Sequence, residues 1–596
     1  MTGHGTGTER QRETVLTQRP ELAEKTPEEG VERVNGRSTR LLPLIRNGCR
    51  AHPARLRLHR DVVAMIGLVG LLAFLWGRGS GAWYWLDEGI AVGISSHPLG
   101  SIPELLRQDG SPPLYYGLLH VWMSLFGSSE SATHLLSLIF ALATVPTALW
   151  AGWSLFGRRA GWMCALVASV NPFIAYYANE TRMYSLVVLL TLFVVATFAH
   201  GFVFRRRGHL IGFAASLVLL LYTHNWGLLV GVGCAVTFVV LLVLASGTER
   251  RRTLRDGALA FGAVGLLYLP WLPTLLYQHA AQLQPWAEKP TLFLIRNEVA
   301  ALVGGVEGAV ALGVGAGVGL ATMLRWPWNR EGLALFGMAV VPIVVVAGAW
   351  ATSLFAYRYL AVVVAPLVLL AGAGLARGGR TGVAALAVVA FLTAPIAVRT
   401  PPYQKSNAKA AAAQVASALR PGDVVLSPDP QLPPLLSHYL PTGLRYVTTA
   451  GPVPDERVVD WRGIVERLRD GDPTRTLPAV VDELPPGAHA VLLCPPTGSR
   501  DIATLRQRVA SPFESDAASR TAVGGLGGGD RGDGSSADVP IAPEEITLFH
   551  RLIGRRCDET ALLLLEHPRL RLDQKIEPLT GITWTPVEGL LLTKVG

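Results

Sequence analysis

The sequence predicts a polytopic α-helical membrane protein with about 11 spanning helices, followed by a C-terminal extracytoplasmic α/β domain. Three observations support this fold class. The chain of 596 residues is 50% hydrophobic and 16% charged, and its mean hydropathy is +0.35, which is typical of a membrane protein with a soluble appendage. Apolar runs of spanning length recur between residues 62 and 398, and charges and prolines become more frequent after about residue 403. A soluble globular fold of the whole chain is therefore not expected.

The N-terminal segment is polar and rich in arginine, with no acidic residue between Arg33 and Arg60. It is too long for the positive region of a signal peptide, and no cleavage site of small residues follows the first apolar run. We expect residues 1–60 to form a disordered, Arg-rich cytoplasmic tail. The run at residues 62–77 is then the first spanning helix, which enters from the cytoplasm.

Ten more apolar runs are long enough to be spanning helices. They lie at about residues 132–155, 160–177, 183–203, 209–223, 226–246, 257–273, 297–322, 332–354, 358–376 and 381–398. Clusters of arginine, such as Arg205–Arg207 and Arg250–Arg252, fall on alternate loops between them. Because basic loops stay in the cytoplasm, the other loops of this membrane domain, residues 61–402, face outward. The net charge of +9 thus reflects topology and not nucleic-acid binding.

One apolar stretch, residues 113–126, does not fit this alternation. If it crossed the membrane it would invert every later loop, and a run of about 14 residues is short for a crossing. We expect it to be a re-entrant or membrane-surface helix within a long outer loop, residues 78–131. The alternative is a twelfth spanning helix, which would put the arginine clusters outside.

Unusual polar residues gather on the outer side of this topology. They are Asp87 and Glu88 after the first helix, the loop at 176–184, the segment 222–226, the loop at 277–289 and the tripeptide 357–359. Charges near lipid are costly unless something compensates for them, so ionisable residues that converge at helix ends are functional candidates. We interpret the Asp87–Glu88 pair as the acid/base centre of a membrane-embedded transferase.

Several ordered motifs resemble those of GT-C glycosyltransferases. They are the outward Asp87-Glu88 pair, the segment Ser111-Pro-Pro-Leu-Tyr-Tyr116, the turn Gly157-Arg-Arg159 and the stretch from Asn171 to Tyr184. More narrowly, residues 60–400 resemble glycosyltransferase family 39, the protein mannosyltransferase and aminoarabinose transferase group. The resemblance implies transfer of one sugar, a hexose or pentose, from a polyprenyl-phosphate carrier to an acceptor on the outer face of the cell membrane. The chain departs from the family pattern at His134, where arginine is common.

Such a transfer needs a base for the acceptor hydroxyl and cations for the departing phosphate. Asp87 is our candidate for the general base, and Glu88 assists it, positions the acceptor or caps a helix. The alternative interpretation is that both acids only start a helix, where they interact favourably with its dipole.

Arg182, Arg358 and Lys289 are the candidates for binding the donor phosphate, since a guanidinium offers a planar charged fork to phosphate oxygens. Two alternatives stay open: Arg182 pairs with Glu180 in a structural salt bridge, and Arg358 extends to the membrane interface. The resemblance gives Glu180 the family's second acidic position, which binds the acceptor or a metal.

No cofactor is certain. Asp87, Glu180 and His224 form a mixed oxygen and nitrogen set that could hold a divalent metal, although their spacing does not demand one. We expect His120 and His134 to make local hydrogen bonds. No Walker or dinucleotide-type glycine motif is present, so the donor is expected to be lipid-linked and not a nucleotide sugar.

The C-terminal part, residues 403–596, is predicted to be a small α/β domain with a flexible loop at 524–536. Short apolar runs at 423–427, 489–493 and 589–593 indicate strands, and 408–419 and 464–469 indicate helices. Cys494 and Cys557 could form a disulfide there.

The alternative function is a polytopic lipid or glycan transporter or flippase without transferase chemistry. Such a protein should show internal repeats and broken helices at matching positions, and the sequence shows no such repeats.

Overall fold

The computed structural model describes residues 52–281, 290–324, 329–352, 355–398, 404–498, 500–511, 548–579, 582 and 585–596. Most of the predicted tail, the loop at 524–536 and Lys289 lie outside these residues. The chain divides into two compact units, residues 1–63 and 64–596, of which the second contains nearly all described elements. Helix α1 (His52–Gly77) begins before residue 60, so the end of the predicted disordered tail is helical.

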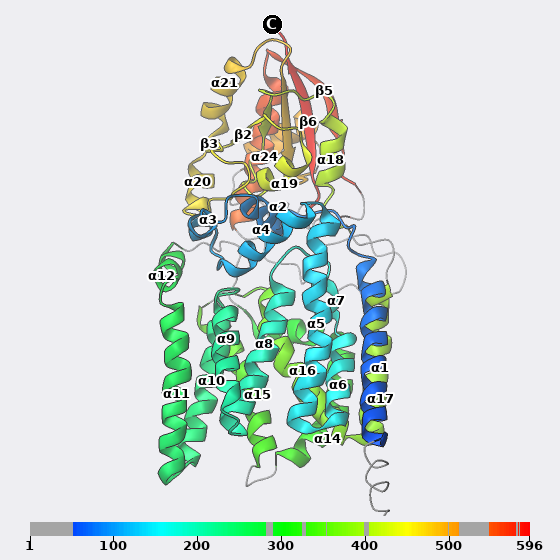
Figure 1. Ribbon diagram of the computed structural model, residues 1–596. Coiled ribbons are helices and arrows are strands. Elements are labelled where there is room, and N and C mark those ends of the chain that lie inside the picture. The colour runs from blue at the N-terminus through cyan, green and yellow to red at the C-terminus, as the bar shows by residue number, and fades with distance from the viewer. Residues whose placement is uncertain are drawn as a thin grey trace, which may run out of the picture. The chain divides into compact units, whose positions relative to one another are not determined.

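The first part of the larger unit is a bundle of mostly antiparallel helices (Figure 1). Its elements are α5 (Glu130–Phe156), α6 (Arg158–Ser169), α7 (Pro172–Tyr177), α8 (Tyr184–Phe198), the π-helix η1 (Ala199–Val203), α9 (Gly208–Leu221), α10 (Gly227–Leu244), α11 (Gly247–Tyr268), α12 (Leu272–Ala280), α13 (Leu292–Ala301), α14 (Gly305–Met323), α15 (Arg330–Thr352), the 3₁₀-helix η2 (Tyr357–Leu360), α16 (Ala361–Arg377) and α17 (Gly379–Val398). Among the described residues, seven helices are long and apolar enough to cross a membrane, or eight if α11 and α12 form one bent span.

Two expected spans are broken, and local chemistry explains both. The run at 160–177 divides into α6 and α7 because Asn171 caps α7, its Oδ1 accepting a hydrogen bond from the backbone N of Ile174 at 3.0 Å, with Pro172 as the first helical residue. The run at 297–322 divides into α13 and α14 at Gly304 and Gly305, which both have φ +91°. The spans expected at 209–223 and 381–398 are shorter apolar helices.

Small residues let the central helices approach one another closely. A Cβ on Gly372 of α16 would lie 2.3 Å from the Sγ of Cys164 in α6, and one on Gly319 of α14 would lie 2.1 Å from the carbonyl oxygen of Gly374. Close backbone approach is a general means of helix association in membranes, where apolar surface alone provides little driving force.

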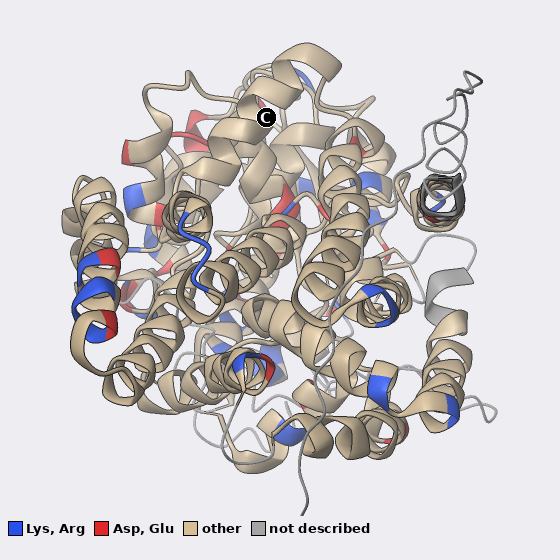
Figure 2. Cartoon of the chain, turned by 60° about the horizontal axis from the view of Figure 1, so that its bottom comes forward, with Lys and Arg blue, Asp and Glu red and all other residues tan. Residues whose placement is uncertain are grey.

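Basic residues gather at one end of the bundle, where Figure 2 shows blue segments at helix ends and tan helix bodies. The loop before α9 contacts the start of α11, since Arg205 pairs with Glu249 at 3.0 Å and Arg207 with Asp256 at 2.9 Å. Similarly, Arg377 at the end of α16 pairs with Glu331 of α15 at 2.8 Å. The arginine-bearing loops therefore share one side, as the alternation in the sequence predicts.

Three short helices lie between the other end of the bundle and the C-terminal sheet (Figure 1): α2 (Leu86–Ser95), α3 (Ile102–Asp109) and α4 (Leu114–Phe126). The segment expected to be re-entrant or surface-bound is thus a separate apolar helix of 13 residues, α4. Helix α2 packs tightly against α19 (Leu432–Tyr439), because a Cβ on Gly89 would lie 2.7 Å from the Cα of Leu435.

The C-terminal domain is a mixed six-stranded sheet in the order β3-β2-β1-β4-β6-β5. The central strand β1 (Val424–Leu426) is parallel to β2 (Arg445–Thr448) and β4 (His489–Cys494), and β6 (Glu588–Lys594) is antiparallel to β4 and to β5 (Leu570–Ile576). The short β3 (Gly451–Pro452) closes one edge. All three residues of β1 are buried, as expected for a strand covered on both faces.

Helices complete this domain: α18 (Ala408–Val415), α20 (Ile464–Asp470), α21 (Pro473–Glu483), α22 (Ile502–Ala510) and α24 (Leu548–Glu566). The three strands and two helices expected from sequence are therefore confirmed. Cys494 at the end of β4 and Cys557 of α24 form a disulfide across 63 residues of sequence. A bond of this kind is typical of an oxidising compartment.

Candidate functional site

A cavity of about 610 Å³, including its open mouth, lies where the helix bundle meets α2, α3 and the C-terminal domain. Its lining comes from six separate segments of the chain. The lining residues are Asp87, Ile90, Asp109, Gly110, Ser111, Pro112, Arg182, Met183, Tyr184, His224, Asn225, Trp226, Arg358, Tyr359 and Trp461. Four residues expected to be functional, Asp87, Arg182, Arg358 and His224, are thus brought together.

Asp87 lies in the first turn of α2 between two arginines. Its Oδ2 is 3.9 Å from the Nε of Arg182 and 3.8 Å from the Nε of Arg358. The side chains of Asp87, Arg182 and Arg358 are 16%, 12% and 20% exposed, respectively. The charges therefore interact in a partly desolvated space. Asp87 therefore starts a helix and also faces the cavity.

The paired charges are not saturated by hydrogen bonds. Asp87 Oδ2, Arg182 Nε and Arg358 Nε are buried without a hydrogen-bond partner among the described residues. Arg182 uses Nη1 to donate to the backbone oxygen of Asp87 at 3.2 Å and to the hydroxyl of Tyr116 at 3.3 Å, which fixes its orientation. Because buried polar groups are normally paired, these atoms indicate a ligand-binding position.

Glu88 does not line the cavity. Its Oε2 accepts a hydrogen bond from the backbone N of Trp85 at 3.4 Å, so it caps α2, as one of its expected roles required. Glu88 is 1% exposed. Its Oε1 lies 2.6 Å from Nε2 of His134 and accepts a hydrogen bond from the backbone N of Thr181 at 2.7 Å. Burial by itself would raise the pKa of Glu88, but the charge and hydrogen bond of His134 lower it, so the carboxylate is ionised. Glu88 holds the loop that carries Arg182.

Glu180 also lies away from the cavity lining, so the structure does not place it as an acceptor or metal ligand there. Its Oε2 is 2.5 Å from Nζ of Lys405, the residue where the C-terminal domain begins. This ammonium lies over the ring of Tyr176 at 4.5 Å and that of Trp85 at 5.4 Å. The alternative pairing of Glu180 with Arg182 is wrong, since Arg182 pairs with Asp87.

His224 lines the cavity as a neutral imidazole. Burial, with the charges of Arg182 and Arg358, lowers the pKa of His224 to about 3. Its Nδ1 accepts a hydrogen bond from the backbone N of Trp226 at 3.1 Å.

The three residues proposed for a metal do not meet. Within the described parts of the chain, no group of three His, Cys, Asp or Glu side chains could hold a metal ion, so Asp87, Glu180 and His224 form no such cluster. The local roles expected for the other histidines are confirmed, since Nδ1 of His120 lies 2.9 Å from the Ser95 carbonyl oxygen and Nδ1 of His134 lies 2.8 Å from that of Ser80.

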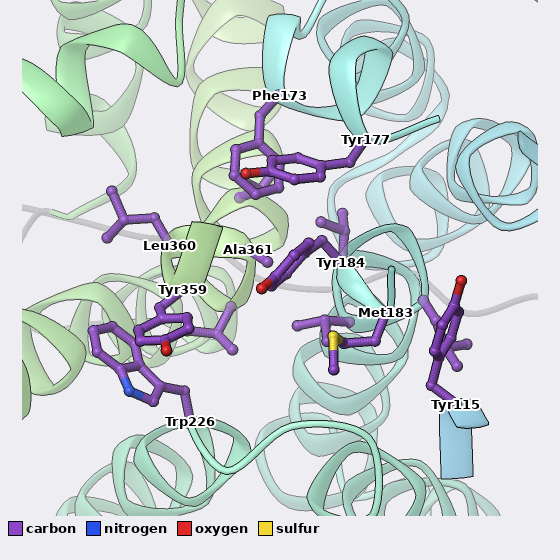
Figure 3. Packing of buried hydrophobic residues seen from close by; sticks show 14 of the residues in the cluster. Tyr115, Phe173, Tyr177, Met183, Tyr184, Trp226, Tyr359, Leu360 and Ala361 are labelled. Atoms are coloured by element: carbon purple, nitrogen blue, oxygen red, sulfur yellow. The ribbon is translucent and has the colours of Figure 1, made fainter. Parts of the chain in front are cut away.

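Aromatic side chains extend from the cavity into the bundle (Figure 3). Tyr359 packs against Trp226 with ring centroids 5.1 Å apart. Tyr184 packs against Tyr177 at 4.8 Å, and Tyr177 against Phe173 at 4.4 Å. Tyr184, Trp226 and Tyr359 line the cavity, and Tyr177 and Phe173 pack behind them in the core.

Sequence reasoning missed three residues of this region: Asp109, Trp461 and Lys405. Asp109 is the last residue of α3, and burial raises its pKa above the usual range. Asp109 lies two residues before the Ser111-Pro112-Pro113 motif in the expected outer loop, and this position in the sequence could have identified it as a candidate site residue. Nothing local marks Trp461 or Lys405, because each meets the site only through the packing of the C-terminal domain.

Comparison with known proteins gives the fold. No protein-family model matches the chain, and no curated protein sequence matches it. Among solved structures, ArnT from Cupriavidus metallidurans bound to undecaprenyl phosphate aligns with a TM-score of 0.51 and 16% identity over 72% of this chain and 93% of that one. The apo form of that protein aligns with a TM-score of 0.46 and 18% identity over 73% of this chain and 93% of that one. An Archaeoglobus fulgidus oligosaccharyltransferase aligns with a TM-score of 0.44 and 13% identity over 74% of this chain and 69% of that one. The likeness to ArnT shows the fold, and the predicted GT-C-like architecture is therefore confirmed.

Proposed function

We propose that this protein is a membrane glycosyltransferase that moves a single sugar from a polyprenyl-phosphate-linked donor to an acceptor on the outer face of the cytoplasmic membrane. The observation that carries the proposal is the cavity in which one carboxylate, Asp87, lies 3.9 and 3.8 Å from two guanidinium groups whose Nε atoms have no hydrogen-bond partner. The fold supports it, since the structural neighbours are glycosyltransferases.

The two arginines suit the donor phosphate. Arg182, in the loop between α7 and α8, and Arg358, in η2, converge on the cavity. Both present an unpaired N–H in a desolvated space, where charge-assisted hydrogen bonds to phosphate oxygens are strong. Undecaprenyl phosphate in the similar ArnT structure is a lipid of this chemistry. Tyr184, Trp226 and Tyr359 line the same cavity and suit the first apolar units of a polyprenyl chain.

Asp87 suits the general base. As the acceptor oxygen attacks the anomeric carbon, the Asp87 carboxylate takes the hydroxyl proton. The bond from the anomeric carbon to the phosphate oxygen breaks, and the negative charge that develops on the leaving phosphate lies beside Arg182 and Arg358. The new glycosidic bond forms on the opposite face of the sugar, so the reaction inverts the anomeric configuration.

The basic end of the bundle is the cytoplasmic end in this proposal, because positively charged loops are retained inside. The cavity and the C-terminal domain then lie outside, where the Cys494–Cys557 disulfide is favoured.

Replacing Asp87 with Asn tests the proposal. We expect transfer from synthetic polyprenyl-phosphate hexoses and pentoses to fall at least about 100-fold, since a positioned base contributes about 10²- to 10⁴-fold. Binding of decaprenyl phosphate should be at least as tight as in the wild type, because a negative charge beside the phosphate has been removed. Mass spectrometry of the products and thermophoresis report the two quantities.

The matched control is Asp256→Asn, the same change in an ion pair at the basic end of the bundle. It should leave transfer unchanged. Full transfer by the Asp87 variant would contradict the base assignment. A wild-type protein that translocates the lipid and never cleaves its glycosyl bond would instead be a transporter.

A further inference from the structure

The C-terminal domain contributes one residue to the wall of the cavity, Trp461, which lies in the loop 460–462. The backbone N of Trp461 donates to the carbonyl oxygen of Gln108 in α3 at 3.3 Å. Arg462 pairs with Asp460 at 2.7 Å and donates to Oε1 of Gln108 at 3.3 Å. These contacts anchor the loop on the end of α3, beside the charged centre.

Trp461 is held in one orientation. It is 3% exposed, and its ring packs against Phe549 of α24 with centroids 6.0 Å apart. Phe549 is itself buried and does not line the cavity. The C-terminal domain therefore presents a rigid aromatic group to the cavity, which is the kind of support a binding residue needs.

Asp109 lies next to this tryptophan and lines the same cavity. The side chains of Trp461 and Ser111 hydrogen-bond its carboxyl group, and the hydroxyl of Tyr116 donates to Oδ2 at 3.4 Å. Since Tyr116 also accepts from Arg182, a single hydroxyl connects Asp109 to the donor-phosphate arginine. Asp109 is thus connected to the charged centre through the hydroxyl of Tyr116, on the side toward the C-terminal domain.

We propose that Trp461 and Asp109 form a subsite for the ring of a carbohydrate acceptor, an assignment that rests on the proposed glycosyltransferase function. An indole offers a flat apolar surface to the C–H face of a sugar ring, and the neighbouring carboxyl oxygens accept hydrogen bonds from its hydroxyls. A lipid chain would leave the carboxyl group unused. A peptide backbone presents both N–H and C=O groups and suits an acceptor-only carboxylate less well.

The first test measures contact directly. The protein in nanodiscs is mixed with a panel of methyl hexopyranosides and methyl pentofuranosides, and saturation-transfer NMR records which ring protons receive magnetisation. At least one glycoside should show strong transfer to its ring protons. Trp461→Ala should reduce that transfer at least fivefold, while Trp461→Phe, which keeps an aromatic face, should retain at least half of it.

The matched control is Trp150→Ala, the same change at a residue of α5 that does not line the cavity. It should keep the wild-type signal, and all variants should bind decaprenyl phosphate within twofold of the wild type. Asp109→Asn should reduce the signal from hydroxyl-bearing positions.

Four results would overturn the subsite. The first is that no glycoside in the panel contacts the wild type, and the second is that Trp461→Ala retains the full saturation-transfer signal. The third is that a serine tripeptide alone shows contact that depends on Trp461. The fourth is equal weakening of glycoside and decaprenyl phosphate binding by Trp461→Ala, because a collapsed cavity explains that result. Failure of the proposed function would appear separately, as absence of sugar transfer while glycoside contact remains.

Discussion

At the scale of single residues, the centre of the site is a carboxylate between two guanidinium groups. Asp87 lies 3.9 Å from Arg182 and 3.8 Å from Arg358, beyond hydrogen-bond distance from both. Ion pairs this loose in a partly buried cavity leave desolvated N–H groups unpaired, and unpaired buried groups cost free energy. In the proposed function, a phosphate between the two arginines would satisfy these groups and recover part of that free energy.

Arg358 can be tested by changing its geometry and its charge separately. We expect Arg358→Met to weaken decaprenyl phosphate binding roughly 10- to 100-fold, because hydrogen bonds to charged groups are worth about 1.5–3 kcal/mol. Arg358→Lys should lie between this variant and the wild type, since lysine keeps the charge but loses the planar fork. Thermophoresis in detergent gives the affinities, and Arg377→Met at the basic end should change nothing. Unaltered binding by Arg358→Met would remove this arginine from the phosphate site.

Asp429, after β1 in the C-terminal domain, predicts a pH dependence of stability. Burial raises the pKa of Asp429 from 3.8 to about 6. Because the folded-state pKa is raised, the protonated carboxyl contributes fully below pH 3.8, and its contribution is lost as the pH rises through about 6. Asp429→Asn should therefore raise the unfolding temperature at pH 7.5 and not at pH 4.

Thermal unfolding in detergent at the two pH values checks this prediction. The exposed Asp470 provides the control, since Asp470→Asn should have little effect at either pH. An equal shift for Asp429→Asn at both pH values would show that ionisation of this residue is not the cause.

At the scale of elements, two buried carboxylates hold the loop between α7 and α8 in place. Glu88 of α2 accepts a hydrogen bond from the backbone N of Thr181 at 2.7 Å, and Glu180 pairs with Lys405 at 2.5 Å. Arg182 follows directly in sequence. Neither acid lines the cavity, so they are positioning residues that set where the guanidinium of Arg182 lies relative to Asp87.

Lys405→Met tests this positioning role. Removing one partner of a buried pair leaves Glu180 uncompensated, and we expect a loss of about 3–5 kcal/mol in stability, with a lower kcat as Arg182 moves. The double variant Glu180→Leu with Lys405→Met should recover much of the stability, because no lone charge remains buried. Thermal unfolding and transfer kinetics measure the two effects. A Lys405→Met protein as stable and active as the wild type would contradict this role.

At the scale of the whole molecule, charge separates the two ends of the larger unit. The arginine-bearing loops pair with one another at one end, and the candidate site lies at the other. Because basic loops are retained in the cytoplasm, this asymmetry predicts an outward-facing cavity.

Cysteine accessibility in intact cells tests the orientation. Cys164 and Cys234 are buried, Cys494 and Cys557 are bonded, and Cys49 is replaced by Ser. In that background, a membrane-impermeant maleimide should label Glu104→Cys in α3 without permeabilisation. Arg250→Cys at the basic end should react only after permeabilisation. The reverse labelling pattern would show that the cavity opens toward the cytosol. That result would contradict the proposed transfer on the outer face of the membrane.

The sequence by itself determined the class of fold and the residues of the charged centre. Spanning length, arginine alternation and the Asp87–Glu88 pair after the first apolar run are local properties, which periodicity and charge reveal without knowledge of packing. Asp87, Arg182, Arg358 and His224 were therefore predicted, and they do line one cavity.

Only the tertiary structure decided what each acid does. Asp87 and Glu88 are adjacent in sequence but project from different faces of α2, so one meets the arginines and the other meets His134 and Thr181. Likewise, Glu180 forms an ion pair with Lys405, and Trp461 contacts Asp109, although each pair is more than 200 residues apart in the chain. Helix direction and domain packing set these pairings, and no spacing of residues along the chain encodes them.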